Sequence, residues 1–355
     1  MTPLEALTPA LEDVLERFRS GARLGLARAI SAVEGERPGF QALLHAVTRE
    51  GLQGRRIGVT GPPGAGKSSL VAQMATHFRT RGETVGIVAV DPTSPFSGGA
   101  LLGDRIRMND LATDPGIFIR SMATRGSLGG LAMATEEVID LMDGFGFDRV
   151  IVETVGVGQT ELEIQSAADT VLVALVPESG DGIQAMKAGL MEIADIFVVN
   201  KADRPGADRL AKELSFAIHL RAGEALKDVP AHHGVQLDAV RKDRTRAKAP
   251  AEPQGWQIPV LKTVAQTGEG LPELLEAIDR HRDHLEATGE LRRRRRTRAE
   301  GRVVDVVERQ LGRLAWSRPG AQDILQDGLD RIESGAATPY SVAESVVQNM
   351  LAPKG

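Results

Sequence analysis

One nine-residue segment limits the possible folds of this chain more than any other feature. Residues 61–69 read GPPGAGKSS and lie between an apolar, β-branched run at 56–60 and a predicted helix that begins at Lys67. Glycines at positions 64 and 66 let the backbone curl so that N–H groups point inward, and the helix adds the positive end of its dipole. This pattern matches G-x-x-x-x-G-K-[ST] and predicts a phosphate-binding P-loop.

The loop residues have distinct predicted roles in holding a nucleoside triphosphate. Lys67 carries a charge to the β- and γ-phosphates, and the Ser68 hydroxyl is a ligand for Mg²⁺. A chance glycine-rich turn is the alternative, and the correctly placed strand and helix argue against it. The predicted nucleotide-binding residues of the loop are Gly61, Pro62, Pro63, Gly64, Ala65, Gly66, Lys67, Ser68 and Ser69.

Strands alternate with helices from residue 55 onward. The strands are short, β-branched and apolar on both faces, as in a buried parallel sheet, so we predict a doubly wound, mainly parallel α/β fold. The predicted strands are 56–60, 85–90, 150–152, 170–175, 196–199 and 258–262, and the predicted helices are 67–81, 131–142, 183–193, 207–220 and 271–285. Polar residues 224–255 are predicted to be an irregular insertion.

Helical patterns flank the α/β region, so we expect an N-terminal helical segment at 1–50, a P-loop domain at 51–288 and a C-terminal helical arm at 289–355. The run Arg292–Arg296 is interpreted as a solvated hinge or as a contact for an acidic partner surface. An apolar stripe beyond it lacks a core of its own, so we expect the arm to form a homodimer. The stripe consists of Val303, Val307, Leu311 and Leu314, and a last helix is predicted to begin at Thr338-Pro339.

Composition narrows the function classes. The net charge of −5 argues against attraction of the whole protein to nucleic acid or to an anionic membrane. The chain has no cysteine, which excludes disulfides, thiolate nucleophiles and cysteine-based metal sites. The N-terminus is interpreted as a helix rather than a signal peptide, and no run of about 18 apolar residues predicts a membrane span. We expect a cytoplasmic protein.

The identity of the base follows from the sequence Asn200-Lys201-Ala202-Asp203, which comes directly after a buried strand. It resembles the N-K-x-D motif of GTPases. The Asp203 carboxylate can accept two hydrogen bonds from guanine, from N1–H and from the exocyclic amine, and adenine offers no such pair of donors. Asn200 and Lys201 brace the pocket, Lys201 with its stem along the base. A simple helix cap at Asp203 is the alternative.

Two further loops fit a GTPase in part. Residues 263–266 stand where GTPases carry an S-A-x loop whose backbone touches guanine, with Val264 in place of the usual Ser or Cys, followed by Ala265 and Gln266. The expected D-x-x-G appears as Glu153-Thr154-Val155-Gly156. Its longer carboxylate can still reach Mg²⁺ or a bound water, and the Gly156 N–H can meet the γ-phosphate.

The residue after Gly156 is Val157, where Ras-type enzymes carry a water-orienting Gln, so we expect slow intrinsic hydrolysis that awaits a partner. The strand 85–90 is reached from the P-loop through one helix, which implies a parallel neighbour. In Ras this strand is antiparallel. The order of elements therefore favours the SIMIBI class, whose members typically work as dimers.

Taken together, these motifs resemble the methylmalonyl-CoA mutase-associated GTPases, known as MeaB or ArgK. The resemblance spans about residues 20–290 and rests on GPPGAGKSS, VDPTSPFSGGALLGDRIRM, ETVGVGQTE, PESGDGIQAMKAGLMEIAD and NKAD. It implies a GTP-hydrolysing chaperone that gates cofactor loading of an adenosylcobalamin-dependent acyl-CoA mutase and protects or reactivates it. It also implies GTP or GDP as the ligand and Mg²⁺ as the cofactor.

The resemblance further implies roles for individual residues. Asp91 and Asp104 match acidic residues near magnesium and the γ-phosphate, Glu153 matches the family's glutamate, and Lys187 matches a region that responds to nucleotide and contacts the mutase. Capping or turn formation is the alternative for the aspartates, and a solvated helix position for Lys187. The predicted catalytic set is Lys67, Asp91, Asp104, Glu153 and Lys187, and the predicted metal set is Ser68, Asp91, Asp104 and Glu153.

Other features receive weaker interpretations. Arg105, Arg107, Arg120 and Arg125 are candidate charge stabilisers or ordinary salt-bridge residues. His281 and His284 are interpreted as part of a solvated helix face rather than a metal site. The alternative functions are another SIMIBI NTPase, namely a metal-insertion GTPase or a transport-linked phosphotransferase of the ArgK type.

Overall fold

Seven strands form one sheet in which every neighbouring pair is parallel. The computed structural model describes residues 6–49, 51–92, 111–124, 133–154, 160–178, 189–221 and 255–352. The strand order is β3-β2-β4-β1-β5-β6-β7. The strands are β1 (Arg55–Thr60), β2 (Val85–Pro92), β3 (Ile117–Thr124), β4 (Arg149–Thr154), β5 (Thr170–Leu175), β6 (Ile196–Val199) and β7 (Val260–Lys262). The prediction of a doubly wound, parallel α/β sheet of the SIMIBI kind is confirmed.

Two details of the predicted sheet were wrong. Strand β2 is parallel to β1, but β4 lies between them, so β2 is not the direct neighbour of the P-loop strand. The edge strand β3 was not predicted at all. Its middle residues, Arg120 and Ser121, interrupt the apolar run that marks the other strands.

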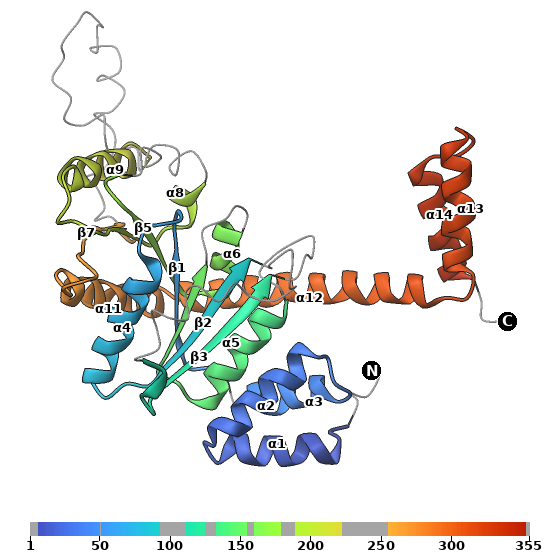
Figure 1. Cartoon of the computed structure of the whole chain (residues 1–355), viewed down its shortest axis with the longest axis horizontal. Helices are drawn as coiled ribbons and strands as arrows, with labels where there is room; N and C mark the ends of the chain where they lie inside the picture. Colours follow the sequence, from blue (N-terminus) through green and yellow to red (C-terminus); the bar gives the residue numbers. More distant parts are fainter. Residues whose placement is uncertain are drawn as a thin grey trace, which may run out of the picture. The chain divides into compact units, whose positions relative to one another are not determined.

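Each face of the sheet carries its own layer of helices (Figure 1). On one face, Ile57, Ile87 and Leu172 pack against α4 (Lys67–Thr80) and α11 (Leu271–Ala287). The opposite face carries Val88, Val152 and Val173, and its covering helices are α5 (Met133–Phe145), α6 (Thr160–Ala167), α8 (Leu190–Ile193) and α9 (Ala207–Arg221). Alternate residues along each strand therefore face different helices. The short helix α6 was not predicted, and most of the predicted helix 183–193 lies outside the described residues.

Three N-terminal helices extend the second layer, where α2 and α3 pack against α5 (Figure 1). They are α1 (Pro9–Arg19), α2 (Arg23–Glu34) and α3 (Phe40–Thr48). Thr8 caps α1, because its side chain accepts a hydrogen bond from the Leu11 N–H. The Phe18 ring meets Phe145 edge to face at 5.2 Å. The N-terminal helices thus share one apolar core with the sheet.

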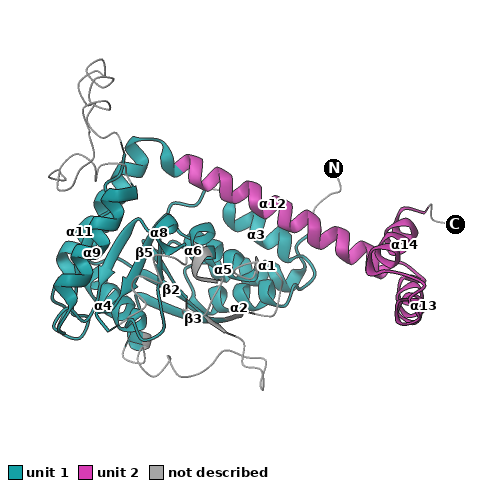
Figure 2. Cartoon of the chain, turned by 90° about the horizontal axis from the view of Figure 1, so that it is seen from above, with its two compact units in different colours: residues 1–291 teal, residues 292–355 magenta. Residues whose placement is uncertain are grey.

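The chain separates into two compact units, residues 1–291 and residues 292–355 (Figure 2). The second unit contains most of α12 (Glu290–Ser317), together with α13 (Ala321–Glu333) and α14 (Pro339–Leu351). Helix α12 runs without interruption through Arg292–Arg296, and the boundary between the two units falls at Leu291 and Arg292, so the run is helical and its role as a hinge stays a prediction. Consecutive arginines are good helix formers, and nothing in this stretch breaks a helix.

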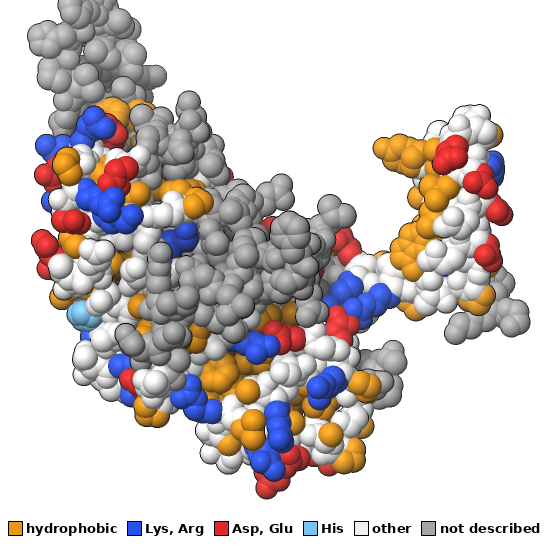
Figure 3. Space-filling view, viewed as in Figure 1, with side chains coloured by type: hydrophobic (Ala, Val, Ile, Leu, Met, Phe, Trp, Pro, Cys, Tyr) orange, Lys and Arg blue, Asp and Glu red, His pale blue; other side chains and the backbone are white. Residues whose placement is uncertain are grey.

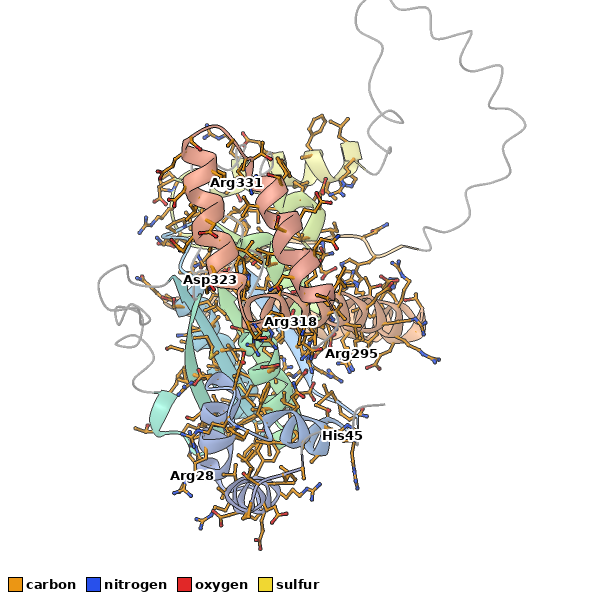
Figure 4. The ribbon with its side chains drawn as sticks, turned by 90° about the vertical axis from the view of Figure 1, so that its right-hand side faces the viewer. Arg28, His45, Arg295, Arg318, Asp323 and Arg331 are labelled. Carbon is orange, nitrogen blue, oxygen red and sulfur yellow. The ribbon has the colours of Figure 1, made fainter. Side chains whose placement is uncertain are left out.

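Helices α13 and α14 pack closely in the second unit. A Cβ at Gly328 would lie 2.4 Å from Val342 Cγ1, so only glycine allows this approach. The guanidinium of Arg318 donates to the carbonyls of Met350 and Ala352, which anchors the end of α14 (Figure 4). As predicted, α14 begins after Thr338, whose side chain accepts from the Ser341 N–H.

Apolar side chains also lie on the outside of this unit, and Figure 3 shows them gathered along one of its faces. The stripe predicted on α12 is exposed, with Leu314 at 58%. On α14, Tyr340 is 88% exposed, and Leu351 is exposed as well. Among the described residues, no helix is long and apolar enough to cross a membrane.

Candidate nucleotide-binding site

The P-loop follows the carboxyl end of β1, and two of its glycines are required by their surroundings. Gly61 has φ +134°, and a Cβ there would lie 2.1 Å from the carbonyl oxygen of Ala174 on β5. Gly66 has φ +80°, and its Cβ would lie 2.5 Å from Asn200 Nδ2. Glycine is therefore needed both for the backbone angle and for the close approach of neighbouring loops.

Helix α4 begins at Lys67, directly after Gly66 in the left-handed conformation. The Lys67 ammonium donates to the Gly61 carbonyl at 2.7 Å and to the Pro62 carbonyl at 3.0 Å. The loop therefore curls around a buried lysine. A charged group held at the N-terminus of a helix, beside main-chain N–H groups, is suited to bind phosphate oxygens.

Ser68 and Glu153 meet beneath the loop. Ser68 Oγ donates to Glu153 Oε1 at 2.6 Å, and both residues are buried. The contact arises from the fold, because β4 pairs with β1 so that Glu153 lies opposite Val59. Two of the four predicted metal ligands are thus brought together, and both offer the oxygen donors that Mg²⁺ prefers.

Asn200 connects three loops at the carboxyl end of the sheet. Its Nδ2 donates to the Ala65 carbonyl of the P-loop at 2.9 Å. Its Oδ1 accepts from the Ala265 N–H at 3.1 Å and from Thr263 Oγ1 at 3.2 Å. The side-chain oxygen of this buried amide thus accepts two hydrogen bonds, and one of its two side-chain N–H groups donates one. The phosphate loop, the N-K-x-D turn and the loop at 263–266 therefore form one assembly.

Lys201 and Asp203 lie at the more exposed side of this assembly. Lys201 is one of two non-glycine residues with positive φ in the described chain, at 54°, and its Nζ donates to the Gly64 carbonyl at 2.9 Å. Such a backbone angle is uncommon outside glycine and is held here by the surrounding loops. Asp203 and Gln266 are exposed, whereas Val264 is buried. The Asp203 carboxylate is therefore accessible to a ligand.

Several predicted site residues lie partly or wholly outside the described residues. Asp91 belongs to β2, where its backbone is in register with Ala123, but its side chain is not described. Asp104, Gly156 and Lys187 lie outside the described residues, as do Arg105, Arg107 and Arg125. Within the described ranges, no three His, Cys, Asp or Glu side chains form a metal-binding group.

The structure decides between the two alternatives for Arg120 and corrects the interpretation of His281. Arg120 lies in the middle of β3 and pairs with Glu34 of α2, so it is a salt-bridge residue. His281 is fully buried rather than solvated, because its Nδ1 meets Thr170 Oγ1 at 2.8 Å and its Nε2 lies 3.3 Å from Asp195 Oδ1. This cluster lies at the amino end of the strands, away from the P-loop.

Sequence reasoning missed one ion pair beside the predicted base site. Arg204, directly after Asp203, donates to Glu178 Oε1 at 2.5 Å. This hydrogen bond lowers the pKa of Glu178. It links the loop after β5 to the N-K-x-D turn. No sequence spacing signals such a contact, because the two loops become neighbours only when β5 and β6 pair.

Comparisons with known proteins agree with this geometry. Residues 26–319 match the family described as methylmalonyl Co-A mutase-associated GTPase MeaB. A Pyrococcus horikoshii protein, whose name gives GTPase as a presumed activity, is 42% identical over 96% of this chain and 98% of its own length. The mouse mitochondrial protein named methylmalonic aciduria type A homolog is 30% identical over 96% of this chain and 81% of its own.

A solved structure covers almost the whole chain. The crystal structure of a protein described as LAO/AO transport system kinase has a TM-score of 0.64 and 26% identity, and it covers 98% of this chain and 99% of that one. The match includes the helices on both sides of the α/β region. The similarity therefore extends well beyond the P-loop.

Proposed function

We propose a function that follows from family membership: this chain belongs to the MeaB family of methylmalonyl-CoA mutase-associated GTPases. The proposed function is that of a chaperone for an adenosylcobalamin-dependent acyl-CoA mutase. As a member of this family the chain is a GTPase that binds GTP and GDP. In the proposed role, its nucleotide state gates cofactor loading of the mutase and protects or reactivates that enzyme.

The contact set of Asn200 is the observation that carries the GTP-dependent part of the proposal. It ties the Ala65 carbonyl in the phosphate loop to the Ala265 N–H in the loop predicted to touch guanine. A change at the phosphates therefore has a short, hydrogen-bonded route to the base-binding loops. In this assignment, Asp203 accepts the two hydrogen bonds from guanine.

Mg²⁺ fits the donor set of the proposed site. Ser68 Oγ and Glu153 Oε1, 2.6 Å apart, are both hard oxygen donors. We assign these two residues to magnesium, with Asp91 and Asp104 as the further acidic candidates. Bound there, the ion would offset negative charge on the phosphates. Lys67 binds the phosphate oxygens, and the buried walls around Ser68 and Glu153 limit access of water.

Turnover by the protein alone is proposed to be slow, because Val157 stands where a water-orienting Gln is found in Ras-type enzymes. We assign Lys187 to the region that contacts the mutase. We also propose that this protein and the mutase are both cytoplasmic. We assign a homodimer to residues 289–355, since the stripe of Val303, Val307, Leu311 and Leu314 is exposed along α12. Pairing with a second copy would remove this stripe from water.

The test of the proposed function measures GTP turnover and nucleotide affinity of the full chain with and without its cognate mutase. Weak turnover alone and clear stimulation by the mutase are expected. A mutase that changes neither quantity would contradict the chaperone assignment.

The base assignment has a test of its own. Asp203→Asn should weaken the binding of GTP and improve the binding of xanthosine triphosphate, because the substitution reverses the polarity of one hydrogen bond. An unchanged preference in a competition assay would show that the base assignment is wrong.

A transport-linked phosphotransferase is the second candidate, and the similar solved structure, described as a LAO/AO transport system kinase, supports it. The two functions differ in where the γ-phosphate goes. Labelled GTP that yields only free phosphate in the presence of candidate acceptors would remove the kinase. Label transferred to an acceptor would replace the chaperone assignment.

A further inference from the structure

Two buried threonines lie at the carboxyl ends of β1 and β4. Thr60 is the last residue of β1, directly before Gly61, and Thr154 is the last residue of β4, directly after Glu153. Neither side chain reaches solvent. Thr154 Oγ1 donates to Thr60 Oγ1 at 2.9 Å. One side-chain hydrogen bond thus joins the entry of the phosphate loop to the strand that carries Glu153.

The alternation of β4 places the two polar residues on opposite faces of the sheet. Ile151 packs with α4 and α11, whereas Val152 packs with the helices of the other face. Glu153 therefore faces α4, where Ser68 meets it, and Thr154 faces away from α4. The end of β4 therefore has a side-chain hydrogen bond on each face, in addition to its main-chain pairing with β1 and β2.

These two bonds fix the position of Glu153 better than either bond alone. The Ser68 bond holds the carboxylate, and β4 pairs with β2 through Thr154. Its main-chain pairing with β1 ends one residue earlier, at Val59 and Glu153, so these contacts oppose least a shift of the strand end away from β1. The Thr154–Thr60 bond opposes that shift, because hydroxyl hydrogen bonds weaken steeply with distance and angle. The same face is also closely packed: a Cβ at Gly58 of β1 would lie 2.7 Å from Ile164 Cγ1 of α6.

We propose that Thr60 and Thr154 form a positioning pair that keeps Glu153 in register with Ser68 and so sets how strongly Mg²⁺ supports nucleotide binding. The pair acts through Glu153 and touches no predicted ligand atom. The inference rests on the magnesium role proposed above for Glu153. Its readout is the gain in nucleotide affinity that Mg²⁺ provides, which does not depend on hydrolysis.

The experiment measures the affinity of the full chain for a non-hydrolysable GTP analogue, with Mg²⁺ and with EDTA, and also the Tm. Thr154→Val has nearly the same shape but lacks the donor. It should reduce the Mg²⁺-dependent gain about fivefold to tenfold, the worth of one hydrogen bond, and leave the affinity in EDTA unchanged. It should also lower the Tm, since the Thr60 hydroxyl loses a buried partner.

The double variant Thr60→Val with Thr154→Val separates positioning from stability. It leaves neither hydroxyl behind, so the Tm should recover relative to Thr154→Val, while the Mg²⁺-dependent gain stays low. Recovery of both quantities would overturn the proposal, because the pair would then serve stability only. Thr170→Val is the matched control. This buried strand threonine bonds His281 at the amino end of β5, so its loss should leave the Mg²⁺-dependent gain intact.

Glu153→Gln distinguishes the inference from its premise. If Glu153→Gln leaves the Mg²⁺-dependent gain intact, the magnesium assignment of Glu153 is wrong, and the positioning role falls with it. If Glu153→Gln abolishes the gain and Thr154→Val preserves it, the magnesium assignment holds and only the positioning pair is rejected. Loss of the gain in both variants, with Thr170→Val unaffected, is the expected result.

Discussion

The two ends of the parallel sheet are held together by different chemistry, although the same strands form both. At the carboxyl end, the contacts around the P-loop involve mostly main-chain groups, hydroxyls and one buried amide, that of Asn200. At the amino end, a network of contacts between full charges is added to the neutral hydrogen bonds. Asp279 of α11 accepts from Arg149, Arg55 and Arg81 at 2.8, 2.9 and 3.1 Å.

The centre of the amino-end network is Arg149, the first residue of β4. Its side chain is only 4% exposed, its guanidinium lies 4.6 Å from the centre of the Phe78 ring, and it also pairs with Glu83. Burial by itself would lower the pKa of Arg149, but the hydrogen bonds to Glu83 and Asp279 outweigh it and raise that pKa. The cation is thus matched by carboxylates of its own chain.

This contrast suits the two ends of the sheet to different roles, ligand binding at the carboxyl end and stability at the amino end. The amino end matches its charges internally and therefore contributes to stability. The carboxyl end brings together Lys67 and main-chain groups, which can exchange their present partners for those of a ligand. Variants at the two ends should accordingly separate turnover from stability, and three of them test this in order of decreasing effect.

Lys67→Ala should have the largest effect. Removing the charge that we propose binds the phosphates should lower GTP turnover by about 10²- to 10³-fold, the range found when one charge-stabilising donor is removed from an active site. The Tm should change little, since Lys67 contacts loop carbonyls and not the core. Lys212→Ala, an exposed lysine of α9, is the control and should match the unmodified protein in both assays. A large loss of Tm in Lys67→Ala would break the comparison.

Most of the fold could be predicted from the sequence, because a periodic pattern of apolar residues marks buried strands and helices. Strands β1 and β5 are apolar on both faces, and their predicted bounds nearly match the observed ones. Strand β3 and helix α6 escaped prediction for physical reasons. The first is an edge strand with Arg120 at its centre, and the second has eight residues, too few for a clear period.

Site residues could be predicted from the sequence where they belong to one contiguous motif, but not where only the fold brings them together. The P-loop and N-K-x-D residues could be named from their spacing, and the structure brings Gly66 against Asn200. The pairs Thr60–Thr154 and Glu178–Arg204 join residues far apart in the chain. Their contact depends on strand order, which could be predicted only in part, since β4 was not expected between β1 and β2.

Asp279→Asn should have an intermediate effect, now on stability alone. It removes the shared carboxylate of three arginines and leaves the buried Arg149 with Glu83, so we expect a loss of about 1–3 kcal/mol in the free energy of unfolding. The Asp279 side chain is 28% exposed, which keeps the loss below that of a fully buried pair. Asp283→Asn, an exposed residue of the same helix, is the control. Denaturant unfolding measures the loss, and a parallel fall in GTP turnover would contradict the separation of the two ends.

Asp148→Asn should have the smallest effect, and that effect should depend on pH. Burial alone would raise the pKa of Asp148, but hydrogen bonds from the Thr84 N–H and hydroxyl, together with the charge of Arg149, lower it overall. A carboxyl group with a lowered folded-state pKa stabilises the protein above its unfolded pKa of about 3.9, and this contribution is lost as the pH falls through the folded value. The Tm of Asp148→Asn should therefore lie slightly below that of the unmodified protein at pH 7, and the difference should shrink steadily below about pH 4. A difference that stays constant down to pH 3 would mean that the Thr84 contacts stabilise by shape rather than by charge, and the amino end would then resemble the carboxyl end more closely than its ion pairs suggest.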